Sequence, residues 1–188
     1  MMTPTDIVTA DVRLIYPSLF EATPKFMGSD DMRYQATFLI PEDADLSPYQ
    51  SAIDAALAAK FSGKVPKLAD HPVRSADEKA ADGKGGFEMG WHYIAAKSFD
   101  AKTPPLVVDQ RRNEIIDTSM VYGGCWVRAH IRAYAWAFSG KKGVSFDLKA
   151  VQLVRGGDPI GGASSRASAD VFGNLDFDAE SDHSDSLL

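Results

Sequence analysis

Residues 123–148, GGCWVRAHIRAYAWAFSGKKGVSFDL, alternate between apolar and polar positions. Every second residue from Cys125 to Ala137 is small or apolar. The intervening positions carry mainly aromatic or basic side chains, namely Trp126, Arg128, His130, Arg132, Tyr134, Trp136 and Phe138. Successive side chains of a strand point to opposite faces, so the pattern predicts a strand with one core-facing side and one basic, aromatic side. The SGKKG turn and the run 144–154 then complete a predicted β-hairpin.

Three further segments, 7–16, 33–41 and 91–99, show strand patterns, and 104–109 reads as a short extended piece. Residues 64–90 are polar and glycine-rich in part, which is typical of a long mobile excursion. Five or six strands with one helix favour a small, mostly antiparallel β-barrel, because closing the sheet removes exposed edges.

One helix is predicted over residues 47–63, with Ser47 as the N-cap, Pro48 in the first turn and Gly63 just past the end. Apolar residues recur in it every four positions, at Tyr49, Ile53, Leu57 and Phe61. Such a stripe predicts a helix that packs on the sheet.

Composition and charge predict two parts in the 188-residue chain: a folded body over 1–158, and a flexible Gly/Ser-rich linker with an acidic tail over 159–188. From Asp170 onward the chain holds six acidic residues and no Lys or Arg, so the tail accounts for the whole net charge of −6. Neither a membrane span nor a signal peptide is predicted. The single cysteine, Cys125, excludes an intramolecular disulfide and is expected in the core.

Catalytic chemistry finds little support. Asp109, Glu114 and Asp117 are the most suggestive set, since three carboxylates can hold Mg²⁺ as in a nuclease, but this spacing is also common in solvated loops. The glycine-rich stretches lack the spacing of nucleotide-binding motifs, and the four histidines lack metal-ligand spacing. We therefore expect a protein that is not an enzyme and holds neither a cofactor nor a metal.

Binding of single-stranded nucleic acid fits the hairpin better, because it needs cations for phosphates and rings for unpaired bases. Arg128, Arg132, Tyr134 and Trp136 supply both on one predicted face. Further candidates are Arg111, Arg112, Lys141 and Lys142, and a weaker set is Trp91, Tyr93 and Lys97. Trp126 and Phe138 are expected to be packing residues. In the alternative interpretation a bend turns Trp136 and Phe138 into the core and leaves the arginines as solvated charges.

Five blocks of the sequence resemble the bacteriophage single-stranded DNA-binding proteins, which have an OB-fold and an acidic C-terminal tail. The blocks are YPSLFEAT at 16, YQATFLIP at 34, PPLVVDQRRNEIID at 104, VYGGCWVRAHIRAYAW at 121 and KGVSFDLKAVQLVRGGDPIGG at 142. The resemblance implies a mainly β, OB-fold-like barrel that coats single-stranded DNA in phage replication and recombination. Because neither a membrane span nor a signal peptide is predicted, the protein is expected to stay in the cytoplasm, which is that of the host cell if a phage encodes it.

The resemblance also implies that the tail contacts replication or recombination proteins. The tail residues predicted for this role are Asp170, Phe172, Asp176, Phe177, Asp178, Glu180, Asp182, Asp185 and Leu188. The chain ends in DSLL, whereas related tails often end in an aromatic residue. A homo-oligomer and RNA binding stay open, and so do two other functions: a phage structural or assembly β-barrel protein, and the Mg²⁺-dependent nuclease.

Overall fold

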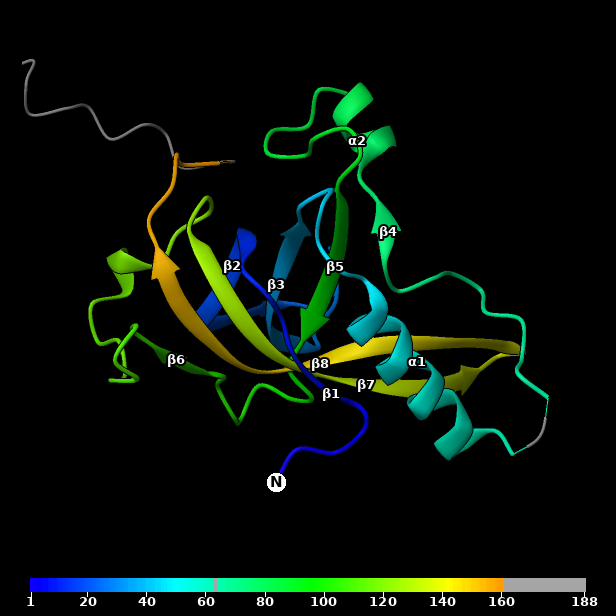
Figure 1. The fold of residues 1–188 in the computed structure, drawn as a ribbon. Helices are drawn as coiled ribbons and strands as arrows, with labels where there is room; N and C mark the ends of the chain where they lie inside the picture. Colours follow the sequence, from blue (N-terminus) through cyan, green and yellow to red (C-terminus); the bar gives the residue numbers. More distant parts are fainter. Residues whose placement is uncertain (63, 161–188) are drawn as a thin grey trace, which may run out of the picture.

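Five strands close a barrel in the order β2-β3-β5-β8-β7 and back to β2 (Figure 1). The computed structural model describes residues 1–62 and 64–160. The barrel strands are β2 (Val12–Pro24), β3 (Met32–Ile40), β5 (His92–Lys97), β7 (Trp126–Phe138) and β8 (Lys141–Arg155). Short strands β1 (Asp6–Val8), β4 (Arg74–Ser75) and β6 (Leu106–Val108) pair with β7, β5 and β8. Of all the strand pairs in the described residues, only β5–β8 and β6–β8 are parallel. The predicted mainly antiparallel barrel is confirmed.

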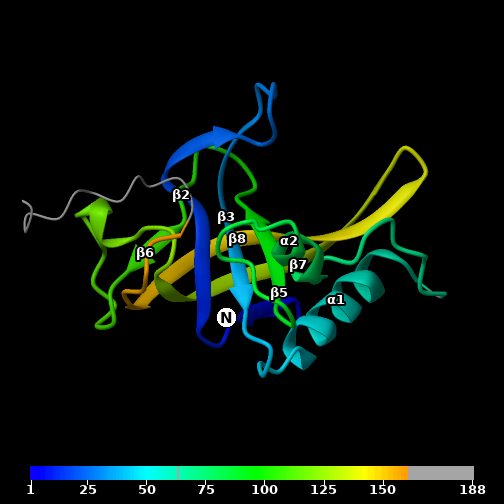
Figure 2. The same ribbon diagram turned by 90° about the horizontal axis from the view of Figure 1, so that it is seen from above.

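The hairpin of β7 and β8 is the longest pairing in the barrel, running from Trp126 opposite Arg155 to Phe138 opposite Lys141. Ser139 and Gly140 form its turn with φ values of 50° and 77°, the left-handed conformations that favour a tight hairpin turn. The distal end of the hairpin projects beyond the barrel (Figure 2). The predicted hairpin is therefore confirmed.

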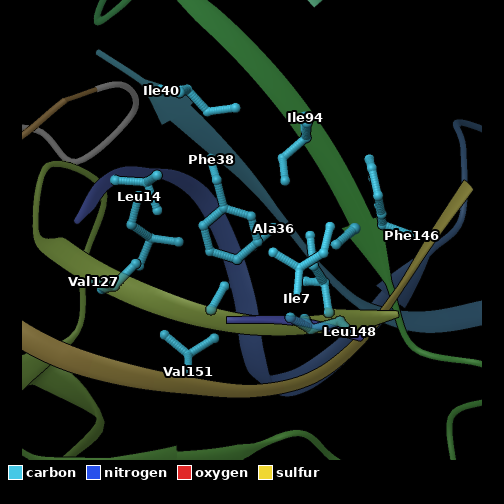
Figure 3. Packing of buried hydrophobic residues seen from close by; sticks show 14 of the residues in the cluster. Ile7, Leu14, Ala36, Phe38, Ile40, Ile94, Val127, Phe146, Leu148 and Val151 are labelled. Carbon is cyan, nitrogen blue, oxygen red and sulfur yellow. The ribbon is translucent and has the colours of Figure 1, made fainter. Parts of the chain in front are cut away.

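The core fills the barrel with one inward-facing set of side chains from every barrel strand (Figure 3). Leu14, Phe38, Ile94 and Val127 are fully enclosed there. Cys125 is buried as predicted, directly before β7. Burying each large apolar side chain stabilises the fold by about 1.5–3 kcal/mol before the entropy of ordering is subtracted.

The interposed helix, α1 (Ser47–Lys60), packs on β7 at one side of the barrel (Figure 1). Three residues of its predicted apolar stripe, Tyr49, Ile53 and Leu57, are buried, whereas Phe61 follows the helix and is half-buried. The Tyr49 ring meets Phe146 edge-on at 6.5 Å. The predicted N-cap was wrong by one residue, because Leu46 takes this position and no side chain caps the helix. The Asp45 carboxylate, one residue earlier, accepts from the Ser47 N–H (2.9 Å) and hydroxyl (2.8 Å).

Residues 64–90 contain more structure than the sequence indicated, because β4 and the short helix α2 (Asp77–Ala81) lie within them. These elements are too short to show a hydrophobic period. Residues 76–87 cover part of the outer face of the sheet, and Phe87 packs there with Ile15, Leu39 and Ile160. One 3₁₀ turn, η1 (Thr118–Met120), precedes β7. Among the described residues no helix is long and apolar enough to cross a membrane.

Candidate nucleic-acid interface

Outward-facing residues of the five barrel strands form one concave band across the sheet. Strand pairing places Ser18 beside Gln35, Gln35 beside Lys97, and Tyr134 beside Ser145. Two hollows of about 670 Å³ and 370 Å³ share Ala95 and Lys97, so they adjoin across β5. The band is therefore continuous from β2 to β7.

We name the larger depression the hairpin hollow and the smaller one the Tyr16 hollow. The hairpin hollow is lined by Lys25, Pro72, Arg74, Tyr93, Ala95, Lys97, Tyr134, Trp136, Phe138, Val144, Ser145 and Phe146. The Tyr16 hollow is lined by Tyr16, Ser18, Gln35, Ala36, Thr37, Ala95, Ala96 and Lys97. Neither lining includes an acidic residue, so the charged groups of both hollows are all cationic.

Trp136 is held in a fixed position at the wall of the hairpin hollow. Its indole N–H donates to the Ser145 hydroxyl at 3.0 Å, and its ring lies directly over Gly143 on the paired strand. A Cβ added at Gly143 would lie 2.5 Å from ring atom Cε2, which shows how closely the ring approaches the backbone. The hairpin thus supports the indole as a rigid platform.

Tyr134 and Phe138 lie on the same side of β7 as Trp136 and remain exposed, with 47% and 80% of their surfaces accessible. The prediction that Phe138 is a packing residue was wrong. Phe138 forms the last pair of the hairpin, opposite Lys141, and the distal end of the hairpin projects beyond the barrel. Trp126, by contrast, packs as predicted, at 6.3 Å from the Trp91 ring with the Arg155 guanidinium over it at 4.5 Å.

Cations gather at the end of β5, where the two hollows meet. The Lys97 ammonium donates to the carbonyl of Lys25 at 2.7 Å, and Arg33 forms a two-pronged ion pair with Asp31 (2.6 and 2.8 Å). Burial lowers the pKa of Lys97, and the nearby charges of Lys25 and Arg33 lower it further. Asp31 pairs with Lys25 and Arg33, and the charge of Asp100 also acts on Arg33, so these two carboxylates leave one excess positive charge among the three cations.

The two arginines predicted as principal DNA contacts have carboxylate partners in the folded chain. Arg128 donates to Asp11 at 2.8 Å, and Arg132 donates to both oxygens of Asp6 at 2.9 and 3.1 Å. The Asp6 side chain is fully buried, and its hydrogen bond with Arg132 holds the pKa of Asp6 well below its usual range. Neither arginine lines a hollow, although both stay partly exposed on the outer face of β7.

The remaining predicted contacts divide between the band and other surfaces. Tyr93 and Lys97 line the hairpin hollow, whereas Trp91 packs on Trp126 outside it. Lys141 and Lys142 lie at the hairpin tip, where the Lys142 ammonium sits 5.1 Å from the Phe61 ring centre. Arg111 and Arg112 belong to an exposed loop after β6, away from both linings.

The three carboxylates of the nuclease alternative are not gathered into a metal site. Asp109 accepts hydrogen bonds from the backbone of Arg111 and Asn113, and Asp117 accepts from Ser119. These bonds lower the pKa of both carboxyls and stabilise local turns. Across residues 1–62 and 64–160, no group of three potential metal ligands occurs.

Among the cationic and the exposed aromatic lining residues, the sequence analysis missed four: Tyr16, Lys25, Arg74 and Phe138. Tyr16 alone carried a usable signal, since it stands before a proline that interrupts a strand pattern. Lys25 comes from the connection between β2 and β3 and Arg74 from the two-residue strand β4, and only the fold brings them to the band.

Residues 5–186 match the family model described as "Enterobacter phage Enc34, ssDNA-binding protein". The chain belongs to this family. A relative called putative protein p50, from Acyrthosiphon pisum secondary endosymbiont phage 1, is 30% identical over 182 residues, covering 90% of this chain and 94% of the relative. The predicted resemblance is thereby confirmed, and membership of a DNA-binding family agrees with the prediction of a non-enzyme.

Two solved structures share the fold. The single-stranded DNA-binding protein from bacteriophage Enc34, in complex with ssDNA, has a TM-score of 0.69 at 23% identity and covers 82% of this chain and 89% of its own. Gp2.5, a single-stranded DNA-binding protein of bacteriophage T7, has a TM-score of 0.53 at 18% identity, with 82% and 94% covered. At these identities the likeness shows the fold.

Proposed function

We propose that this protein binds single-stranded DNA without sequence preference, along the band formed by the hairpin hollow and the cations beside it. The observation that carries the proposal is the lining itself: three exposed or half-buried rings, those of Tyr134, Trp136 and Phe138, line the same hollow as the cations Lys25 and Lys97. Rings stack on unpaired bases, and cations neutralise phosphates. The family membership supports the same function.

The chemistry of the lining favours single strands of any sequence. Every base offers a face to a ring, and each such stack contributes about 1–3 kcal/mol. In a duplex those faces are already covered by neighbouring bases. We infer that the protein coats and protects exposed phage strands during replication or recombination in the host cytoplasm.

A fluorescence titration with oligo(dT) and a matched duplex tests the proposal. Trp136 is the expected reporter, because the other two tryptophans, Trp91 and Trp126, pack on each other away from the hollow. Quenching by the single strand at much lower concentration than by the duplex, relieved by salt, is expected. A Trp136→Phe variant should bind with little quenching. A folded protein without affinity for the single strand would favour the structural or assembly function instead.

We further propose that the acidic tail competes with DNA and recruits replication or recombination proteins. The tail residues lie outside the described residues, so this proposal rests on the sequence: their negative charge complements the cationic band. Removing residues 170–188 should tighten binding to oligo(dT), most clearly at low salt. Weaker binding by the shortened chain would reject the competition.

A further inference from the structure

A β-bulge on β2 sets Tyr16 apart from the regular strand around it. Ile15 pairs with Thr37 and Ser18 with Gln35, so two residues, Tyr16 and Pro17, stand opposite one residue of β3. The bulge gives Tyr16 a φ of 50°, a left-handed conformation that a bulky residue rarely adopts. It also leaves the Tyr16 side chain exposed over more than half of its surface.

The strain at Tyr16 has no packing benefit to explain it. Its neighbour Ile15 is fully buried, whereas Tyr16 contributes nothing to either apolar cluster. Residues in a strained backbone conformation are concentrated at binding sites, where the strain contributes to function. The ring instead lines the Tyr16 hollow, beside Ser18, Gln35 and Thr37.

Lys97 connects the Tyr16 hollow to the proposed DNA site. It lines both hollows, and its backbone lies beside Gln35 on one side and Asp147 of β8 on the other. A strand that leaves the rings of the hairpin hollow and passes Lys97 therefore enters the Tyr16 hollow directly. From β7 to β2 it crosses four interstrand spacings of about 4.8 Å, roughly 19 Å along the sheet.

We propose that the Tyr16 hollow is a second base-binding subsite, in which the Tyr16 ring stacks on an unpaired base whose neighbouring phosphate is held by Lys97. This inference rests on the proposed function. At the B-form rise of about 3.4 Å per nucleotide, 19 Å corresponds to about six nucleotides, and a more extended strand needs fewer. Short oligonucleotides fill the hairpin hollow alone, and longer ones reach both subsites.

The test measures affinity for a ladder of oligo(dT) lengths by fluorescence anisotropy, with the full chain and its variants. Wild-type affinity should rise with length until both subsites are filled. Tyr16→Gly should remove the gain of about 5- to 150-fold that the longer oligonucleotides bring, and should leave the short ones unaffected. Tyr134→Ala, the matched control in the hairpin hollow, should weaken short and long oligonucleotides alike.

The stability of the Tyr16→Gly variant shows whether the Tyr16 ring serves binding or folding. Glycine accepts the left-handed conformation without strain, so the unfolding midpoint of Tyr16→Gly should equal or exceed that of the wild type. Tyr16→Phe keeps the ring and should keep the length dependence. As a measurement that needs no variant, photo-crosslinking of oligo(dT) carrying 5-iodouracil should label the peptide that contains Tyr16.

Three results would overturn the inference. The first is a folded Tyr16→Gly protein with the wild-type length dependence, and the second is crosslinking confined to peptides of the hairpin hollow. Either would leave the proposed function standing with one subsite. Wild-type protein that binds oligo(dT) at no length would instead reject the proposed function, and the second subsite with it.

Discussion

Gly143 controls the position of Trp136 without being able to contact DNA through a side chain, which makes Gly143→Ala a sensitive test of the stacking platform. The added Cβ would lie 2.5 Å from indole atom Cε2. Carbon atoms in contact are about 3.5–4.0 Å apart, so the ring must move by about 1 Å or more. The 3.0 Å hydrogen bond from the indole N–H to Ser145 then lengthens or breaks.

Moving the Trp136 ring should reduce both the folding stability of the protein and its affinity for DNA. Overpacking of this kind costs about 1–3 kcal/mol of folding stability when the ring cannot move freely. A displaced indole also loses part of a base stack that is worth about 1–3 kcal/mol. We expect oligo(dT) binding to weaken by about 1 kcal/mol, roughly fivefold, with a limit near 150-fold if the stack is lost completely.

Fluorescence anisotropy with oligo(dT) provides the affinity, and thermal unfolding provides the stability. Gly85→Ala is the matched control, because nothing lies within 4 Å of a Cβ at Gly85 and its backbone needs no left-handed conformation. The Gly143→Ala change should have no further effect on affinity when Trp136 is already alanine, since it acts through the ring. Wild-type affinity in folded Gly143→Ala protein, or an equal loss in the Trp136→Ala background, would refute the stacking role.

Two further predictions follow from the charges. Lys97→Met should reduce the dependence of log affinity on log salt by about 0.7, one phosphate contact. Burial and nearby cations lower the pKa of Lys97, so as pH rises Lys97 should lose its charge, and the wild type its affinity, at a lower pH than with an ordinary lysine. Lys97→Arg, measured by the same titration, should remove this pH dependence. Asp6→Asn should reduce the free energy of unfolding by about 1–3 kcal/mol at neutral pH, since Arg132 loses its buried charged partner. The pKa of Asp6 is lowered in the folded state, so this contribution to stability is complete above about pH 4 and is lost as pH falls. Denaturant unfolding of the wild type and Asp6→Asn should show that their difference in unfolding free energy shrinks as pH falls below about 4. A difference that stays constant with pH would contradict the prediction.

Periodic segments could be predicted from the sequence, whereas side chains that tertiary pairing controls could not. The alternation of β7 and the four-residue stripe of α1 are local patterns, and both elements form as expected. Arg128 and Arg132 were placed on the correct face of β7. Their partners Asp11 and Asp6 lie more than 110 positions away along the chain, so no local pattern could show that the charges are paired.

The candidate site could be predicted only in part, for a similar reason. Tyr134 and Trp136 belong to a regular alternation, which predicts their face directly. The exposure of Phe138 depends on how far the hairpin extends past the barrel, and Lys25 reaches the hollow from the connection between β2 and β3. The left-handed conformation of Tyr16 depends on a bulge whose register is set by β3.

The outer face of β7 therefore divides into a structural half and a binding half. In the first half, Arg132 pairs with the buried carboxylate of Asp6 on β1, so removal of the guanidinium would leave a buried charge without its main partner. In the second half, Tyr134 and Trp136 line the hairpin hollow together with residues of β5 and β8. A phosphate that approached Arg132 would compete with Asp6 for the guanidinium, whereas one that approached Lys97 would relieve repulsion among three cations. Phosphate binding is thus favoured at the end of β5 rather than along β7.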